Sequence, residues 1–334
     1  MRSDRVGHNA RMVRSRLSAL LALAAVGALV AVLVTVLVSG GSNATVAAPV
    51  QAAPTGAVDA APAVVEQPRK EVEPGPEQVT YAPNATTKAF KPRLTADSFV
   101  VLDADTGTVI IARREQARRP IASLTKVMTA LIVIEDGKLR KKIRVPKVAT
   151  RVEPNREGLV AGRWYERRLL LFSALMVSAN DSATALGHAA GEGSLGRFYR
   201  RMNRRARELG MTRTTYASAS GLEDERNLST ALDQAILARA ALRSPALAKI
   251  VRTRRKLVKW PPPTHAKEWL NHNRMLTRYA GTYGVKTGYT AAAGGCLVVA
   301  VARNGHHLIG VVLASENIWG DMPRLMDAAF RRLG

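Results

Sequence analysis

The pattern of hydrophobic and polar positions divides the chain into three regions. Residues 17–38 are an almost unbroken apolar run, which is long enough to span a bilayer because a membrane helix needs about 20 such residues. Residues 39–95 are rich in Ala, Pro, Val and Thr and show neither a helical nor a strand period. That composition predicts a disordered linker. We therefore expect a folded domain over residues 96–334.

This domain begins and ends with strand patterns. Two β-rich runs around Asp105-Thr106-Gly107 predict a hairpin over residues 99–112. A second hairpin is expected over residues 295–314, where Asn304-Gly305 separates two apolar runs. The expected helices are 123–135, 169–190 with a break at 178–181, 195–209, 229–242 and 322–333. Together these elements predict an α/β (α+β) fold, with an antiparallel sheet flanked by helices and a mostly helical subdomain.

Charge decides how the apolar run is interpreted. Five arginines lie within residues 1–16, and no Lys or Arg follows the run until Arg69. Because basic residues stay on the cytoplasmic side, we expect a cytoplasmic tail over residues 1–16, a transmembrane signal anchor over residues 17–38 and an exported catalytic domain. A cleaved signal peptide, which would leave a secreted protein, is the alternative, although its apolar core is usually shorter.

The formal charge of +24 has two interpretations. A basic exported surface is attracted to anionic polymers or lipid headgroups, or the arginine-rich composition only keeps the domain soluble. Residues 165–168 form an unusually basic approach to their helix. Nucleic acid is not an expected partner outside the membrane. The single cysteine, Cys296, lies in an apolar run, so we expect a small buried side chain.

Candidate chemistry begins at Ser123, three residues before Lys126. Residues at this spacing lie on one face of a helix, so the lysine amine can reach the hydroxyl. A lysine activates a serine only when its pKa falls far below about 10.4. Burial, a second cation and a helix N-terminus all lower it. Alone, the Ser-x-x-Lys spacing is not specific, because a serine that begins a helix and a lysine on its surface would show the same spacing.

Two further motifs follow in order, Ser178-Ala179-Asn180 and Lys286-Thr287-Gly288. With Ser123 and Lys126 they resemble the motifs of the penicillin-recognising serine enzymes. The flanking sequence is similar to the low-molecular-weight penicillin-binding proteins, the D-alanyl-D-alanine carboxypeptidases. The similar segments are 120–130, 178–183, 202–211, 220–222, 229–231, 271–273 and 285–290. The resemblance covers roughly residues 96–334 and implies a β-lactamase/transpeptidase-like fold.

The resemblance also implies catalytic roles. Ser123 would attack the carbonyl between the last two D-alanines of a peptidoglycan stem peptide, with Lys126 as its base. Ser178 would relay a proton to the departing D-alanine. The backbone N–H groups of Ser123 and Tyr289 would form the oxyanion hole. Water would then hydrolyse the acyl-enzyme.

Four residues would bind substrate. Asn180 would hold the peptide backbone, Lys286 would supply the second cation, and Thr287 would bond the terminal carboxylate. Gly288 would let the strand approach the ligand closely. Some relatives carry an arginine for this carboxylate after the last strand, where this chain has Ala314-Ser315-Glu316. The sequence leaves that partner open.

No metal or cofactor is implied. Four histidines show no metal-ligand spacing with carboxylates, and we expect them to be structural or exposed; they are His188, His272, His306 and His307. The expected partners are the peptidoglycan stem peptide, β-lactam antibiotics as covalent inhibitors, and the membrane through the N-terminal helix.

Two other functions stay open. A β-lactamase would need a deacylation base, for which Glu223 and Glu225 are the nearby carboxylates. A non-catalytic penicillin-sensing or wall-binding module would not need an intact Ser123 and Lys126. Endopeptidase and transpeptidase activities share the same acyl-enzyme, so the sequence does not separate them from the carboxypeptidase.

Overall fold

The computed structural model describes residues 78–86, 93–222, 225–260, 262 and 264–334. The predicted cytoplasmic tail and anchor, residues 1–38, lie outside these ranges. No helix within them is long and apolar enough to cross a membrane. The described residues all belong to one compact unit.

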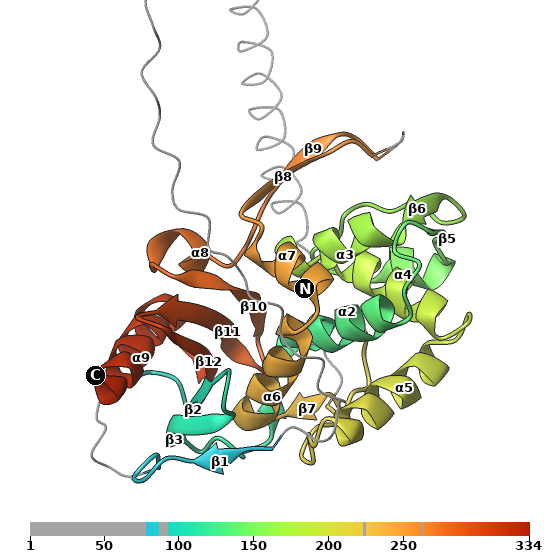
Figure 1. Ribbon diagram of the computed structural model, residues 1–334. Coiled ribbons are helices and arrows are strands. Elements are labelled where there is room, and N and C mark those ends of the chain that lie inside the picture. Colours follow the sequence, from blue (N-terminus) through green and yellow to red (C-terminus); the bar gives the residue numbers. More distant parts are fainter. Residues whose placement is uncertain (1–77, 87–92, 223–224, 261, 263) are drawn as a thin grey trace, which may run out of the picture. The chain divides into compact units, whose positions relative to one another are not determined.

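A six-stranded sheet lies in this unit, with the order β1-β3-β2-β12-β11-β10 (Figure 1). Neighbouring strands are antiparallel, as predicted, except that β1 runs parallel to β3. Both predicted hairpins, β2–β3 and β11–β12, are confirmed. The strands are β1 (Thr80–Tyr81), β2 (Ser98–Asp103), β3 (Thr108–Arg113), β10 (Thr282–Thr290), β11 (Gly294–Arg303) and β12 (His306–Ser315).

The boundary predicted between linker and domain at residue 95 lies too late. Within the predicted linker, Thr80 and Tyr81 pair with β3, and Ala85 is buried in the core. Thr95 donates its backbone N–H and its hydroxyl to the carboxylate of Asp321. These contacts involve single residues and a two-residue strand, too short to show a period in the sequence.

Both faces of the sheet are buried under helices. Val100 and Leu102 of β2 belong to the larger core, whereas Phe99 and Val101 point to a second core under the C-terminal helix, because successive strand residues face opposite sides. The helices are α2 (Thr125–Glu135), α3 (Arg167–Met176), α4 (Asn180–Ala190), α5 (Leu195–Glu208), α6 (Ala231–Leu242), α7 (Pro245–Arg252), α8 (Met275–Arg278) and α9 (Ile318–Leu333). Figure 1 shows α9 on one face and α6 with the helical region on the other.

Helix caps explain where the boundaries differ from the predictions. Thr230 Oγ1 accepts from the N–H of Asp233, so α6 begins as expected. Asn317 accepts from the N–H of Gly320, and α9 therefore starts four residues earlier than the predicted residue 322. The break predicted at residues 178–181 is shorter, because α4 already begins at Asn180.

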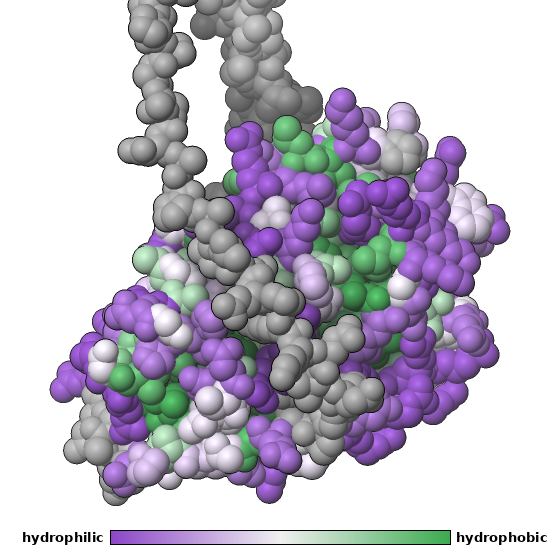
Figure 2. Space-filling view, viewed as in Figure 1, coloured by the Kyte–Doolittle hydropathy of each residue, from purple (hydrophilic) through white to green (hydrophobic). Residues whose placement is uncertain are grey.

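Several short elements were not predicted. They are the 3-10 turns η1 (Ala122–Leu124) and η2 (Lys147–Arg151) and the strand pairs β4 (Arg119–Pro120) with β7 (Leu228–Ser229), β5 (Lys142–Arg144) with β6 (Trp164–Glu166), and β8 (Arg255–Val258) with β9 (Lys267–Leu270). Figure 2 shows hydrophilic side chains over the outer face around β5, β6 and α5. Cys296 is buried in β11, as predicted.

Candidate active site

The Ser123 hydroxyl lies at the start of a buried helix. Ser123 belongs to η1, which continues directly into α2. Its Oγ is 2.7 Å from Nζ of Lys126, one turn further along, as the spacing predicts. Gly221 fixes the approach to this turn, because its φ is +80° and a Cβ there would lie 1.8 Å from the carbonyl oxygen of Ala122. Only glycine fits at that position.

The Lys126 amine has three hydrogen-bond partners inside the protein. It is fully buried and lies 2.7 Å from Asn180 Oδ1 and 2.7 Å from the Ser220 carbonyl oxygen, besides Ser123 Oγ. An amide oxygen and a carbonyl oxygen can only accept, whereas a hydroxyl can donate. A neutral amine would use two N–H groups for the two acceptors and its lone pair for the Ser123 hydroxyl, whereas an ammonium would donate to all three oxygens.

Electrostatics favour the neutral form of Lys126. Burial is the main cause that lowers the pKa of Lys126 well below its ordinary value, and the charge of Lys286 lowers it further. The carboxylate of Asp181 opposes this shift. Lys286 is therefore the second cation that the sequence required.

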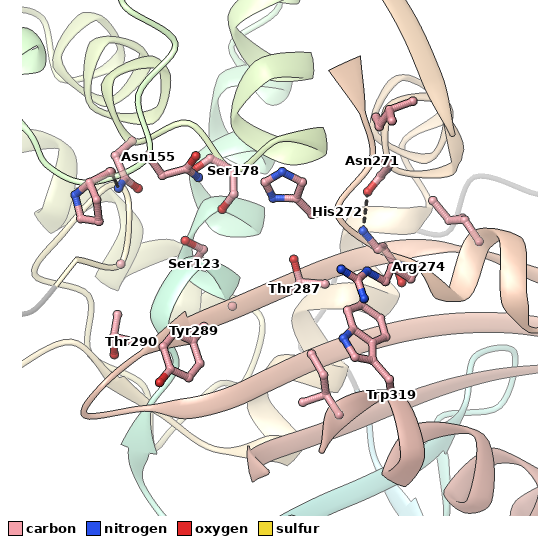
Figure 3. Close-up of a pocket in the computed structure, with 18 of the residues that line it drawn as sticks. Ser123, Asn155, Ser178, Asn271, His272, Arg274, Thr287, Tyr289, Thr290 and Trp319 are labelled. Carbon is pink, nitrogen blue, oxygen red and sulfur yellow. Dashed lines mark hydrogen bonds between the residues drawn. The ribbon is translucent and has the colours of Figure 1, made fainter. Parts of the chain in front are cut away.

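Lys286 on β10 also holds Ser178. Its Nζ donates to Ser178 Oγ at 3.0 Å and to the Thr287 carbonyl oxygen at 2.8 Å. Burial lowers the pKa of Lys286 to about 7. Ser178 has a φ of +62°, a strained conformation for a residue with a side chain. In Figure 3 the hydroxyls of Ser178 and Ser123 point toward each other.

Asn180 is engaged within the protein through both ends of its amide. Its Oδ1 accepts from Lys126, and its Nδ2 donates to the Pro154 carbonyl oxygen. Asn180 lines the pocket and is 4% exposed. Its clearest structural role is thus to orient Lys126, a role that the sequence did not suggest.

Residues 153–159 fold around the turn that carries Ser178. Asn155 Nδ2 donates to the carbonyl oxygens of Val177 and Ser178 at 3.0 and 2.9 Å. The Asp181 carboxylate accepts from the backbone N–H groups of residues 157, 158 and 159. The loop therefore fixes the backbone that presents the Ser178 hydroxyl.

Glu157 connects this loop to the β8–β9 hairpin. Its buried carboxylate accepts from Ser173 Oγ at 2.8 Å and from the indole N–H groups of Trp260 and Trp269 at 3.3 and 3.2 Å. It also forms an ion pair with Lys267 at 2.6 Å. A buried charge needs such complete pairing, so Glu157 locks the loop and the hairpin together.

β10 supplies the remaining predicted residues. Thr287 lines the pocket. A Cβ on Gly288 would lie 3.0 Å from the carbonyl oxygen of Ile121 and 3.1 Å from the Ser123 nitrogen. Gly288 thus lets the strand approach η1, in addition to any ligand. Ser123 and Tyr289 both line the pocket, and the Tyr289 side chain is exposed at its rim.

These residues occupy one end of a cavity of about 1230 Å³. The other end is formed by the β8–β9 hairpin, the turn before α8 and the start of α9; its residues include Arg254, Arg255, Leu270, Arg274 and Trp319. His272 lies between the two ends, beside Ser178 (Figure 3). Asn273 Nδ2 donates to the Gly284 carbonyl oxygen at 2.9 Å, and Asn271 Nδ2 donates to that of Thr253 at 3.0 Å. The two asparagines hold the turn that presents residues 272 and 274 to the pocket.

His272 is exposed, as predicted, and it also lines the pocket, which the sequence did not indicate. Partial burial, then the charges of Lys286 and Arg274, lower its pKa, so both cations lie near it. In the described residues, no group of three or more His, Cys, Asp or Glu side chains is arranged to hold a metal ion.

Sequence reasoning missed the residues that support the motifs. The segments around Ser220 and Asn273 were recognised by resemblance, but nothing in them indicated which atoms would bond to Lys126 or β10. Asn155, Glu157 and Arg274 gave no signal, because each acts through contacts with residues distant in the sequence.

Comparison with known proteins identifies the family. Residues 85–317 match the sequence model of the D-alanyl-D-alanine carboxypeptidases. A D-alanyl-D-alanine carboxypeptidase of Mycobacterium tuberculosis is 35% identical over 243 residues, which cover 70% of this chain and 82% of the relative. A D-alanyl-D-alanine endopeptidase of Escherichia coli is 32% identical over a stretch that covers 75% of this chain and 82% of the relative.

A solved structure agrees with the sequence comparisons. The crystal structure of the Streptomyces K15 DD-transpeptidase is similar with a TM-score of 0.69 and 30% identity, over 73% of this chain and 100% of that one. The predicted transpeptidase-like fold is thereby confirmed. The chain belongs to the D-alanyl-D-alanine carboxypeptidase family of penicillin-binding serine hydrolases.

Proposed function

We propose that the protein is an exported enzyme that removes the terminal D-alanine from peptidoglycan stem pentapeptides through an acyl-enzyme on Ser123. The observation that carries this proposal is the buried amine of Lys126, 2.7 Å from Ser123 Oγ, whose two other partners can only accept hydrogen bonds. Export and anchoring through residues 17–38 rest on the sequence pattern.

The first half of the reaction forms an ester. Ser123 Oγ attacks the carbonyl carbon between the last two D-alanines while its proton moves to Lys126 Nζ. The N–H groups of Ser123 and Tyr289 stabilise the negative oxygen, a contribution worth about 2.7 to 4 kcal/mol for one donor. As the C–N bond breaks, Ser178, held by Lys286 at 3.0 Å, passes its proton to the leaving amine and takes up the proton that Lys126 received, so Lys126 is neutral again.

The second half releases the shortened peptide. Water attacks the ester carbonyl, gives one proton to the neutral Lys126 amine, and displaces Ser123 Oγ, which recovers its proton. The same serine forms a stable ester with a β-lactam when the opened ring prevents this attack. Penicillins are therefore expected to acylate Ser123.

Arg274 is the proposed partner of the substrate carboxylate, together with Thr287. In Figure 3 its guanidinium lies between the Thr287 side chain and the Trp319 indole, and it is 5.6 Å from the centre of the Trp319 ring. A guanidinium that stacks on an aromatic ring keeps its N–H edge available for a carboxylate. Arg274 would thus replace the arginine that some relatives have after the last strand.

The alternatives find different support. Endopeptidase and transpeptidase activities fit the names of two of the similar proteins, and they differ from the carboxypeptidase only in the substrate position or the acceptor. For a β-lactamase, Glu225 does not line the pocket, and Glu223 lies outside the described residues. The pocket-lining carboxylate that the structure does describe, Glu153, is ion-paired with Arg156 at 2.6 Å.

The test is D-alanine release by the full-length protein in detergent from a pentapeptide ending in D-Ala-D-Ala. We expect release that falls at least about 1000-fold in Ser123→Ala, and a long-lived penicillin adduct on Ser123 in the wild type. An adduct without D-alanine release would contradict the carboxypeptidase while leaving the acyl-enzyme intact. Rapid penicillin turnover would instead indicate a β-lactamase.

A further inference from the structure

A strongly basic surface surrounds the β5–β6 hairpin, apart from the active site. Residues 137–151 contain seven Lys or Arg and no Asp or Glu. All seven are exposed, and within the described part of the chain none forms an ion pair; they are Lys138, Arg140, Lys141, Lys142, Arg144, Lys147 and Arg151. We call these residues, with Val148, Arg163 and Trp164, the hairpin surface. Seven unpaired cations repel one another, so this surface favours an anionic partner.

Two large apolar side chains are exposed on the same surface. Trp164 is 58% exposed and Val148 is 42% exposed. Trp164 lies directly across the strand pair from Arg144, and the alternation of the strands puts both on the outer face, because Ile143 and Tyr165 are buried on the inner one. The indole therefore has a cation beside it and solvent in front of it.

A cavity of about 510 Å³ opens beside the hairpin. It is lined by Arg144, Lys147 and His188, together with the backbone around Pro146 and Gly162. Arg144 Nε donates to the Gly162 carbonyl oxygen at 3.1 Å, which orients its guanidinium along the wall. Two cations and an imidazole around one opening suit a phosphate group, which accepts hydrogen bonds from all three.

We propose that the hairpin surface docks the catalytic unit on an anionic lipid bilayer, with a headgroup phosphate between Arg144 and Lys147 and the Trp164 indole at headgroup depth. A soluble polyanion would use the cations alone. A bilayer also has an apolar layer directly beneath its negatively charged headgroups. Tryptophan is enriched at the boundary between the two, and polybasic segments bind to the headgroups. The hairpin surface has the matching composition, because its cations can contact the headgroups while exposed Trp164 and Val148 reach the apolar layer beneath them.

Docking would bring the active site to the membrane surface. Two residues after Arg151 the chain reaches Glu153 and Pro154, which line the active-site pocket. The bilayer would therefore hold the pocket close to stem peptides at the membrane face. This inference does not depend on which acceptor the acyl-enzyme uses.

The test measures the depth of Trp164 in vesicles that contain the full-length protein. Lipids brominated in their acyl chains quench an indole that reaches the bilayer. The vesicles are made of phosphatidylcholine alone or mixed with phosphatidylglycerol, and Trp164→Phe identifies the signal of this indole among the four tryptophans. Because the predicted anchor would hold the chain in either lipid, quenching of Trp164 is measured rather than vesicle binding.

We expect quenching of Trp164 only with phosphatidylglycerol, and its loss at high salt. The variant Lys142→Gln, Arg144→Gln, Lys147→Gln should reduce it to the level seen in phosphatidylcholine. A matched control removes the same charge from the exposed face of α5, by Arg200→Gln, Arg204→Gln and Arg207→Gln, and should leave the quenching unchanged. Penicillin labelling of Ser123 shows that each variant is folded.

Three results would overturn the proposal: no quenching with phosphatidylglycerol, equal quenching in both lipids, or equal loss of quenching in the α5 control. Soluble polyphosphate is the further comparison. A shift of Trp164 emission with polyphosphate but not with anionic vesicles would assign the surface to a soluble polyanion instead.

Discussion

The two ends of the active-site pocket differ in how their side chains are held. At the catalytic end, Lys126 and Lys286 are buried and bonded to three and two partners inside the protein. At the binding end, Arg254, Leu270 and Arg274 are exposed to the pocket. The catalytic end is thus organised before substrate arrives, which is what stabilisation of a transition state requires. Changes there should abolish the reaction, whereas changes at the binding end should alter substrate preference.

The largest effect is expected from Lys126→Met, which keeps the bulk of the side chain and removes the amine. A positioned general base contributes about 100-fold to 10,000-fold, so the rate of Ser123 acylation by penicillin should fall within that range. Stopped-flow acylation measures it. A rate within threefold of the wild type would show that another group activates Ser123.

Glu157→Ala tests how the two ends are connected. The variant leaves two buried indole N–H groups without their acceptor, and each unsatisfied buried donor costs about 1 to 3 kcal/mol. The Lys267 amine, which is 36% exposed, can turn to solvent. Urea denaturation should show that loss in the free energy of unfolding. Glu153→Ala is the matched control, because the Glu153 carboxylate is 64% exposed in its ion pair with Arg156, and such a pair contributes less than about 1 kcal/mol. Similar losses in both variants would contradict a locking role for Glu157.

Arg274→Gln should change substrate preference. A hydrogen bond to a charged group contributes about 1.5 to 3 kcal/mol, so kcat/KM for a peptide with a free D-alanine carboxylate should fall about 10-fold to 150-fold. The same peptide with a terminal amide should be affected less than about threefold, since it has no charge to lose. Arg278→Gln, on α8 but outside the pocket lining, serves as control. An equal loss for acid and amide would exclude a carboxylate contact.

A smaller effect is expected in the pH dependence of acylation. The charge of Lys286 lowers the pKa of Lys126, so Lys286→Gln should raise it and move the acidic limb of the penicillin acylation rate to higher pH. The pKa of Lys286 itself is about 7, and the shift should therefore be seen at and below that pH, where Lys286 is protonated. A limb that stays in place would mean that the two lysines do not interact.

The site residues that could be predicted from the sequence are those that are close to one another along the chain. Ser123 and Lys126 are one helical turn apart, and Lys286, Thr287 and Gly288 are consecutive on one strand, so local geometry alone brings them together. The α+β fold and both hairpins followed from periods of two and of three to four residues.

The supporting residues depend on long-range contacts instead. Glu157 bonds to groups about a hundred residues away in Trp260 and Trp269, and β5 pairs with β6 through only three residues on each side. Segments so short have no period to recognise. The sequence predicts a loop at Asn180 for a similar reason, because the contacts that start α4 there come from residues 154 and 155.

The position of Cys296 has a practical consequence. Burial raises the pKa of its thiol to about 12, so at neutral pH almost none of it is the reactive thiolate, and the side chain has no exposed surface. It is also the single cysteine of the chain. Toward maleimides and other thiol reagents the folded protein should therefore behave as if it had no cysteine. A cysteine introduced at exposed Tyr289, on the rim of the pocket, would be the one attachment point for a fluorophore or spin label, with no need to remove the native residue.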